Sequence, residues 1–479
     1  MRALAGLLAA AFGVAVAEVL AAATRPAAGP LEAVGGAVID ATPTAVKEFA
    51  VRELGTYDKP VLLTVVLIAV AVLAAGTGLV RRWWVGVVVL GLAGAGAALS
   101  RPASRPYDVV PSLVGAALAG LMLWWLLRRR GAPGGVQLDR RGFLRAAALV
   151  AGGAALASAG TVAVRRTGGA DRAAVKLPAA TDPGPSGSPS LITPNRDFYR
   201  VDTALTVPRI DVDSWSLRVY GMVGQERKIT FAELLAMPLV ARAVTMTCVS
   251  NEIGGPYLGT AKWLGVPLAP LLRSVGVSAG ADQLVAHSVD GMTIGTPVAT
   301  LLDGRDAMLA VGMNGEPLPL EHGFPVRMLT PGVYGYAGSC KWLTALELTT
   351  FDKFDAYWVE RGWAAQAPVK TGSRIDHPRP FAQPARGTVT VAGVAWAQQR
   401  GIEAVEVRVD DGPWESAELL SAPSVDTWVQ WRYRWRAGPG PHSLAVRATD
   451  RTGAVQAEGR ATPFPSGATG RHTITVTVA

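Results

Sequence analysis

The sequence predicts a multidomain chain that begins with an all-α transmembrane bundle of about five helices, continues as an α+β domain and ends as an all-β sandwich. Half of the 479 residues are hydrophobic, and the long apolar runs lie near the start of the chain. The middle mixes short helical and strand patterns, whereas the end alternates apolar and polar residues. The predicted parts are a transmembrane domain (1–165), a linker (166–190), an α+β domain (191–378) and a β-sandwich (379–479).

Five apolar segments are each about long enough to cross a membrane. A helix rises by about 1.5 Å per residue and the hydrocarbon core is roughly 30 Å thick, so about 20 residues suffice. The first segment is alanine-rich and follows a single arginine, so a cleaved signal peptide is the alternative for it. The segments lie near residues 3–23, 60–80, 83–100, 110–127 and 144–164.

Arginines between the apolar segments predict the orientation of the bundle. The pair at 81–82, the triplet at 128–130 and three arginines within 140–145 flank predicted spans. The positive-inside rule places these flanks in the cytoplasm and the segments 24–59 and 101–109 outside. The chain after the fifth span is then exported. We therefore expect a multi-pass protein of the cell membrane whose later domains lie on the extracytoplasmic side.

The formal net charge of +9 is confined to the membrane part. Residues 1–166 hold 17 Lys/Arg and 8 Asp/Glu, which is +9, and residues 167–479 hold 29 of each, which is zero. The basic character therefore reflects arginines that flank membrane spans, which excludes a nucleic-acid-binding surface as its explanation.

Local patterns predict the linker and the elements of the α+β domain. The segment 166–190 is rich in Gly, Pro, Ala and Ser, which is typical of a flexible or semi-extended tether. Residues 215–220 alternate like a strand. Thr230 and Glu233 have the spacing of a capping box, which predicts a helix start.

The C-terminal part reads as strands throughout. Alternation over 388–396 and 404–409, with the turn Asp411-Gly412 after the second run, predicts antiparallel strands and a hairpin. Short strands at this spacing favour a sandwich. Trp431, Tyr433 and Trp435 share one face of a strand, and we interpret them as core rather than as a ligand platform.

The chain has only two cysteines, Cys248 and Cys340. Cys248 follows an apolar run, and a thiolate is a soft ligand that suits a soft or high-valent metal. We interpret Cys340 as a buried apolar residue rather than a second ligand. A disulfide between the two is an alternative in an exported protein, but it would consume the metal ligand.

Several motifs, in order along the chain, resemble those of the sulfite oxidase family of molybdopterin enzymes. The resemblance covers roughly 190–479 and includes a C-terminal module similar to the family's Ig-like dimerisation domain. One such motif alone would be weak, but their number and order make the resemblance specific. The matching segments are Asn195–Arg200, Cys248 with Asn251, Leu264–Leu268, Met313–Pro319, His322–Arg327 and Gly338–Leu343.

The resemblance implies a molybdenum–molybdopterin cofactor, oxygen-atom transfer on a small oxo substrate, and a homodimer formed through the C-terminal domain. Cys248 would ligate the molybdenum and so form the catalytic centre. Arg327 and Lys341 would bind the pterin phosphate, the arginine through its bidentate fork and the lysine as a point charge. The further cofactor contacts that the resemblance implies are Asn195, Phe198, Tyr199, Arg200, Asn251, His322, Ser339 and the amide of Cys340.

The segment Asp139–Arg145 resembles a twin-arginine export signal, since it contains Arg140-Arg141 and precedes a mildly apolar Ala/Gly-rich stretch. A molybdopterin is inserted in the cytoplasm, so the domain that holds it must fold before export, which is the task of that system. The alternative is an ordinary cytoplasmic flank of a span.

The ligand loop departs from the family pattern in a way that bears on the substrate. At this loop the family pattern is Cys-Ala-Gly-Asn-Arg-Arg, whereas this chain has Glu252 and Ile253 in place of both arginines. A glutamate would repel a dianion such as sulfite at short range. Sulfite oxidation and the reduction of a neutral sulfoxide or N-oxide therefore stay the two alternatives. Arg200 or Arg242 is the alternative source of positive charge.

The electron route points to a separate redox partner, a membrane quinone or a cytochrome. The sequence has no Cys-x-x-Cys-His motif, and its five histidines all lie beyond residue 166, which excludes a bis-histidine haem within residues 1–166. The opposing hypothesis is a non-catalytic, membrane-anchored interaction module that retains the fold. A transporter is weaker, because the predicted spans lack polar residues and paired interruptions.

Overall fold

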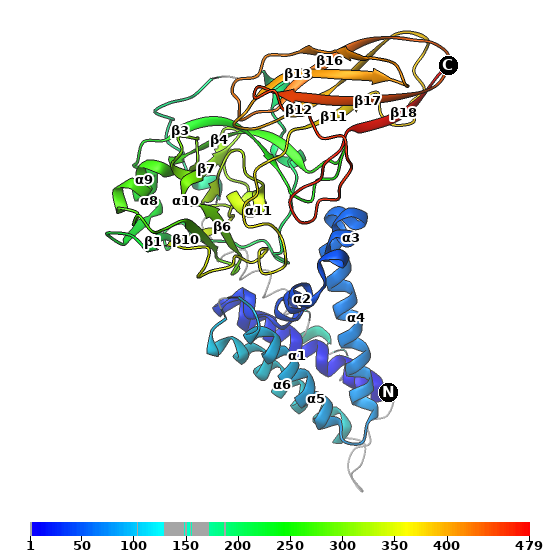
Figure 1. Cartoon of the computed structure of the whole chain (residues 1–479). Helices are drawn as coiled ribbons and strands as arrows, with labels where there is room; N and C mark the ends of the chain where they lie inside the picture. The colour runs from blue at the N-terminus through cyan, green and yellow to red at the C-terminus, as the bar shows by residue number, and fades with distance from the viewer. Residues whose placement is uncertain are drawn as a thin grey trace. The chain divides into compact units, whose positions relative to one another are not determined.

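The computed structural model describes residues 2–102, 104–128, 148, 151–153, 155, 172–185 and 188–479. The chain divides into two compact units (Figure 1). The helical unit comprises Met1–Ala170 and Asp202–Asp211, and the β-rich unit comprises Asp171–Val201 and Val212–Ala479.

The helical unit consists mainly of long apolar helices, because runs rich in alanine and leucine without interior proline favour helix, and a helix satisfies its own backbone groups in an apolar environment. Three of its segments are long and apolar enough to cross a membrane, namely Arg2–Thr24, Asp58–Leu79 and Pro106–Leu127; Trp83–Leu99 is apolar but shorter, with 17 residues. The described helices are α1 (Arg2–Thr24), α2 (Pro30–Ala41), α3 (Thr44–Leu54), α4 (Asp58–Leu79), α5 (Trp83–Leu99) and α6 (Val110–Arg128), with short 3-10 turns at Pro26–Ala28, Gly55–Tyr57 and Pro106–Val109.

Four of the five predicted spans therefore coincide with helices. The fifth, near 144–164, and the twin-arginine-like segment 139–145 fall outside the described residues or on isolated ones within the gap. In the described part of the chain three helices are long enough to cross a membrane, so the number of about five stays a prediction.

The segment 24–59, which connects the first two predicted spans, contains the helices α2 and α3. Pro30 occupies the first turn of α2, where its missing N–H costs nothing. The carboxylate of Glu18, from α1, accepts the N–H of Leu31 at 3.0 Å and so satisfies a free donor of this helix. The capping carboxylate belongs to a different helix, so no local sequence pattern around α2 predicts this contact.

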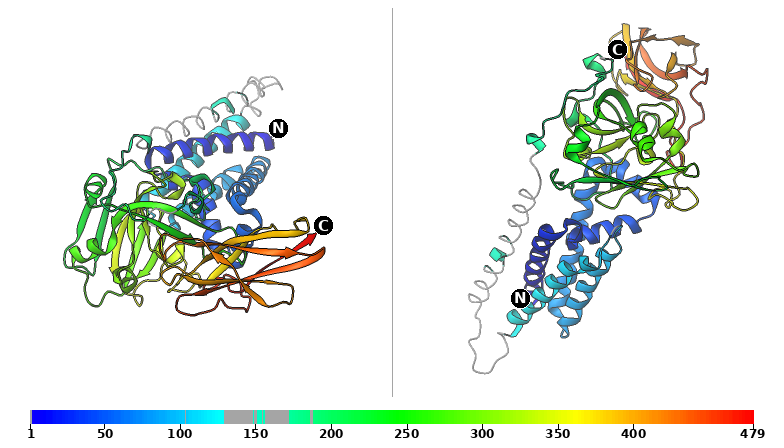
Figure 2. Two further views of the ribbon diagram at one scale, coloured as in Figure 1. Left: turned by 90° about the horizontal axis from the view of Figure 1, so that it is seen from above. Right: turned by 90° about the vertical axis from the view of Figure 1, so that its left-hand side faces the viewer.

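Small residues let α1 pack closely against its neighbours. A Cβ placed on Gly13 of α1 would lie 2.4 Å from the carbonyl oxygen of Gly115 on α6, and one on Gly115 would lie 2.6 Å from that of Gly13. Gly6 approaches α4 in the same way, with the Ala74 carbonyl oxygen 2.1 Å from its added Cβ. Close backbone approach at small residues is the usual way in which apolar helices associate in a bilayer. Figure 2 shows α1 running alongside other helices of this unit.

The first part of the β-rich unit contains, among its described residues, two five-stranded sheets with short helices around them. One sheet has the order β2-β1-β10-β5-β6, with β1 and β10 parallel; the other has β3-β4-β7-β8, and β9 pairs with β7. The strands of the first sheet are β1 (Ser216–Gly221), β2 (Arg227–Thr230), β5 (Gln283–Ser288), β6 (Thr293–Pro297) and β10 (Leu343–Thr349). Those of the second are β3 (Val240–Thr247), β4 (Leu258–Pro267), β7 (Met308–Met313), β8 (Glu316–Pro317) and β9 (Arg327–Leu329).

Short helices connect these strands. Thr230 caps α8 as the sequence predicts, because its hydroxyl accepts the Glu233 N–H while the Glu233 carboxylate accepts the Thr230 N–H. The helices are α8 (Phe231–Leu235), α9 (Leu268–Val275), α10 (Val298–Leu302) and α11 (Gly335–Gly338), with 3-10 turns η4 (Arg172–Ala174), η5 (Pro189–Leu191), η6 (Asn195–Asp197) and η7 (Leu320–His322).

The C-terminal part contains two antiparallel four-stranded sheets in the described chain, β11-β12-β16-β15 and β14-β13-β17-β18. Both contribute to one buried core, which includes Trp431 and Trp435 with Tyr433 packed against it, so the predicted aromatic core face is confirmed. The strands are β11 (Gly372–His377), β12 (Gly387–Trp396), β13 (Ile402–Val409), β14 (Trp414–Ser416), β15 (Glu418–Leu419), β16 (Val429–Ala437), β17 (Gly440–Asp450) and β18 (His472–Val478).

The described part of the predicted linker is not a free tether. The Arg172 guanidinium donates to the carbonyl oxygens of Pro317 and Leu318 at 2.7 Å and 2.8 Å. Asp182 forms a parallel bridge with Val240, the first residue of β3. Its Gly/Pro-rich composition predicts flexibility, but backbone hydrogen bonds to the neighbouring sheet hold it in place.

We predict that Gly115→Leu destabilises the helical unit, because a larger side chain must displace the backbone of α1, and overpacking costs about 1–3 kcal/mol. The thermal midpoint of the full chain in detergent should fall by several degrees. The matched control is Gly96→Leu on α5, where an added Cβ meets nothing within 4 Å. Equal midpoints for the two variants would contradict the close α1–α6 contact.

Candidate functional site

Cys248 lies immediately after β3, at the start of a loop that the backbone closes on itself. The Cys248 N–H donates to the Tyr257 carbonyl oxygen at 2.9 Å, and the Cys248 carbonyl accepts the Asn251 N–H at 3.1 Å. The Asn251 side-chain oxygen accepts the Tyr257 N–H at 2.8 Å, and Asn251 is buried. Asn251 therefore holds the shape of the loop that presents the cysteine.

The two thiols have different environments. Cys248 is half-buried, and its Sγ lies 3.3 Å from the Ser250 hydroxyl oxygen. Burial raises the pKa of Cys248, whereas hydrogen bonds at Ser250 and the nearby Lys341 ammonium lower it. Cys340 is fully buried, and burial raises its pKa strongly. Both cysteines are free, so the alternative of a disulfide is excluded and Cys248 is the thiol that a metal can reach.

Arg327, the first residue of β9, places a buried guanidinium in the site. Only 7% of this residue is exposed. Its Nε donates to the Ser339 hydroxyl at 2.9 Å, its Nη1 donates to the His322 carbonyl at 3.3 Å, and Ser339 donates onward to the Met328 carbonyl at 2.9 Å. These two acceptors fix the orientation of the guanidinium.

His322 is held as a neutral imidazole at the end of η7. Burial, and then the Arg327 charge, lower the pKa of His322 to about 4. Its Nε2 lies 3.2 Å from the Asn195 carbonyl oxygen, and only a protonated Nε2 can donate there. The Asn195 side chain is itself held by Asn314 and Glu316, at 2.8 Å and 2.5 Å. The hydrogen bond from His322 to Asn195 therefore fixes the imidazole against η6.

Aromatic side chains form the wall behind these groups. Phe198 is buried, with its ring centroid 5.3 Å from that of Tyr199 in a stacked pair and 5.5 Å from that of His322 in an edge contact. Burial, and then the charge of Cys248, raise the pKa of Tyr199. The Tyr199 hydroxyl, which lies near the thiol, therefore stays protonated at neutral pH. Arg200 follows and is half-buried.

Lys341 completes the charged set. Its ammonium donates to the Glu321 carbonyl at 3.2 Å and lies 4.6 Å from the centre of the Trp342 ring. The Cys340 carbonyl accepts the Met328 N–H at 2.9 Å, which ties this segment to β9. Gly323 has a φ of +109° and lies so close to Lys341 that an added Cβ would be 3.0 Å from the Lys341 Cα. Glycine is required at that position by both observations.

The structure thus gathers most of the predicted residues around Cys248, and corrects one expectation. Arg242 does not supply charge to the ligand loop, because its guanidinium is bound to Asp182 and Asp306 at 2.5 Å and 2.9 Å, near the start of β3. Sequence reasoning missed Tyr334 and Lys370. The Cys248 charge helps to raise the pKa of Tyr334, which reaches about 12 chiefly through burial.

The residues present fit a molybdenum–molybdopterin cofactor. A single reachable thiol offers one soft ligand and leaves the other positions of a metal to a dithiolene. Two cations, Arg327 and Lys341, and a neutral imidazole lie close by, and a dianionic phosphate needs such charge-assisted donors. The phosphate of the cofactor would bring negative charge to the buried Arg327 guanidinium, and such pairing stabilises a buried charge.

Comparisons with known proteins agree with this interpretation. Residues 204–358 match the family model described as oxidoreductase molybdopterin binding domain. The chain is 29% identical over 273 residues to mitochondrial sulfite oxidase of Rattus norvegicus, which covers 48% of this chain and 50% of that protein. It is 31% identical over 153 residues to the uncharacterized oxidoreductase YuiH of Bacillus subtilis, covering 32% of this chain and 74% of that protein.

A solved structure shows the same fold. The sulfane dehydrogenase SoxCD from Paracoccus pantotrophus aligns with a TM-score of 0.52 at 24% identity, over 59% of this chain and 80% of that one. The chain spans about half the length of the mitochondrial sulfite oxidases that it matches. These matches, together with the thiol and its cationic surroundings, establish that the chain belongs to the sulfite oxidase family of molybdopterin-dependent oxidoreductases, whose cofactor is molybdenum–molybdopterin.

Proposed function

We propose that this protein is a membrane-anchored oxidoreductase that transfers an oxygen atom to or from a small substrate at a molybdenum ligated by Cys248. The observation that carries the proposal is the half-buried Cys248 thiol, which directly follows β3 and is influenced by the nearby Lys341 ammonium. The bound cofactor supplies a metal that cycles between two oxidation states and exchanges an oxo group.

The protein side chains bind the cofactor and control charge. Cys248 must bind as the thiolate, and the Ser250 hydrogen bonds and the Lys341 ammonium stabilise that form against the cost of burial. Arg327 offers a fixed fork to the pterin phosphate, because Ser339 and the His322 carbonyl already set its plane. His322 remains neutral, so it hydrogen-bonds without adding charge.

Two tyrosines near Cys248 would act as neutral donors toward a substrate oxygen. Tyr334 is buried and its pKa is raised to about 12, so its hydroxyl is protonated at neutral pH. The pKa of Tyr199 is raised further by burial. Neither hydroxyl carries a negative charge that would repel an oxo group. Such preoriented donors are what an oxygen-transfer site needs as charge moves onto the transferred oxygen.

The membrane helices support anchoring, and we extend the proposal to sidedness and partners. The arginine distribution favours a cytoplasmic location for the short flanks and an extracytoplasmic location for the domains after residue 190, exported by the twin-arginine-like segment 139–145. Electrons would pass to or from a separate partner, a membrane quinone or a cytochrome. The two C-terminal sheets would form an Ig-like domain through which two chains dimerise.

We predict that Cys248→Ser abolishes turnover and lowers the molybdenum content while leaving circular dichroism and thermal midpoint nearly unchanged. Activity would be assayed in both directions with artificial electron donors and acceptors on sulfur and nitrogen oxo compounds. Cys340→Ala is the matched control, because it removes the buried thiol but keeps the backbone amide. Undiminished turnover in Cys248→Ser would refute the ligand assignment.

Arg327→Met should reduce the bound pterin and molybdenum per chain several-fold, because the phosphate loses its bidentate donor. The measurement is pterin fluorescence after oxidation, alongside molybdenum by mass spectrometry. Arg218→Met serves as the control, since Arg218 lies on the surface and pairs with Glu226. Arg327→Lys should give an intermediate content. Full cofactor content in Arg327→Met would show that this guanidinium does not hold the cofactor.

A further inference from the structure

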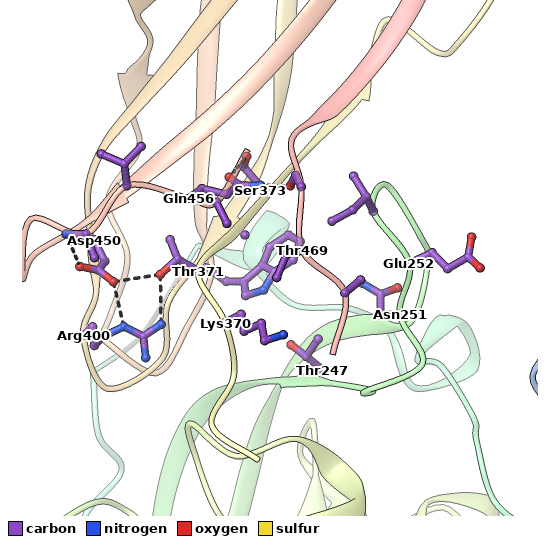
Figure 3. A pocket seen from close by; sticks show the side chains of 18 of the residues that line it. Thr247, Asn251, Glu252, Lys370, Thr371, Ser373, Arg400, Asp450, Gln456 and Thr469 are labelled. Carbon is purple, nitrogen blue, oxygen red and sulfur yellow. Dashed lines mark hydrogen bonds and ion pairs between the residues drawn. The ribbon is translucent and has the colours of Figure 1, made fainter. Parts of the chain in front are cut away.

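A cavity of about 310 Å³ lies beside the ligand loop, within the β-rich unit (Figure 3). Thr247 and Asn251, which flank Cys248 in the sequence, line one side of it together with Tyr334. The other side is formed by residues 370–373 and by segments of the C-terminal sheets and their loops. The cavity therefore joins the neighbourhood of the thiol to the C-terminal part of the chain.

Four charged residues line the cavity, the cations Lys370 and Arg400 and the anions Glu252 and Asp450, and they differ in how they are placed. Arg400 and Asp450 form an ion pair at 2.8 Å, and Thr371 donates to the same carboxylate at 2.9 Å, so these two charges cancel. Glu252 is exposed, and Figure 3 shows its carboxylate directed away from the other labelled side chains. The Glu252 carboxylate is therefore not directed toward a ligand in the cavity. With Arg400 and Asp450 paired to each other, Lys370 supplies the charge that a ligand in the cavity would meet.

Lys370 directs its ammonium into the cavity from the segment before β11. Its Nζ donates to the Gly467 carbonyl at 2.6 Å and lies 3.4 Å from the Ser466 hydroxyl oxygen, and both acceptors are neutral. Figure 3 shows the ammonium end directed toward Thr247. Its backbone N–H lies 3.4 Å from the Tyr334 hydroxyl, which links it to a residue near Cys248. Burial lowers the pKa of Lys370, and among the described residues no carboxylate pairs with its ammonium.

The remaining wall is largely apolar and the space is larger than an inorganic oxyanion needs. Ile253, Trp396, Val455 and Ala457 contribute to it. Ligand cavities of roughly 300–1,000 Å³ with mostly apolar walls and a few polar groups suit organic molecules. A bare sulfite ion would contact Lys370 and leave most of the apolar wall unused.

We propose that this cavity binds the substrate, that the substrate is a small organic anion, and that Lys370 is the specificity-determining residue that contacts its anionic group. The inference rests on the proposed function and deepens it, because it favours an anionic substrate over a neutral one. In this chain the positive charge comes from the segment before β11 instead of from the ligand loop, where Glu252 and Ile253 stand.

The test uses the purified full chain in detergent and a pair of probes that differ in charge. Butane-1-sulfonate and the neutral butyl methyl sulfone have similar shapes, and calorimetry at low ionic strength gives the dissociation constant of each. The wild type should bind the sulfonate about tenfold or more tightly than the sulfone, as a charge-assisted hydrogen bond allows. Lys370→Met should remove this preference, and Lys370→Arg should keep most of it.

Lys228→Met is the matched control, because Lys228 is an exposed lysine on β2 and lines no part of the cavity. An unchanged preference in Lys370→Met would overturn the role of Lys370, and sulfate binding as tight as that of butane-1-sulfonate would overturn the organic class. Molybdenum and pterin are measured on the same samples. If the protein contains no molybdenum or pterin but Lys370→Met still removes the preference for the sulfonate, only the proposed function is refuted. If the protein contains the cofactor and Lys370→Met leaves the preference unchanged, only this inference is refuted.

Discussion

The closed loop from Cys248 to Tyr257 is the constraint on which the site depends, because it fixes where the thiol points. Its strand is also held from the C-terminal part of the chain. The Trp428 N–H donates to the Thr245 hydroxyl at 2.7 Å, and the Thr245 N–H donates to the Asp426 carbonyl at 2.9 Å. The C-terminal sheets are therefore part of the scaffold that positions the thiol, as well as one wall of the cavity beside it.

Charge explains the rest of the arrangement. Arg327, Lys341 and Lys370 all donate to neutral acceptors at 2.6–3.3 Å. These acceptors orient the three cations, and each cation attracts an incoming anion. His322 adds no charge, and Glu252 is directed outward. The pattern suits two anions at one centre, a cofactor phosphate near Arg327 and a substrate near Lys370.

The sequence was informative where the signal is local. Apolar runs predicted five helices, four of which coincide with described helices. The Thr230–Glu233 spacing predicted a cap, and the alternating aromatics around Trp431 predicted a core face. Contacts between distant segments carried no such signal. The Glu18 cap on α2, the Arg242 ion pairs and the approach of Lys370 to the ligand loop each join residues from different elements, more than ten positions apart. The family motifs located Cys248 and Arg327, but the cavity required the fold.

The most direct test of the central claim is the cofactor content of the wild-type chain. Full-length protein from a molybdopterin-competent host would be analysed for molybdenum by mass spectrometry and for pterin by fluorescence after oxidation. The account predicts about one molybdenum and about one pterin per chain, as a single-thiolate site of this family requires. Absence of both from folded protein would contradict it and favour a non-catalytic interaction module.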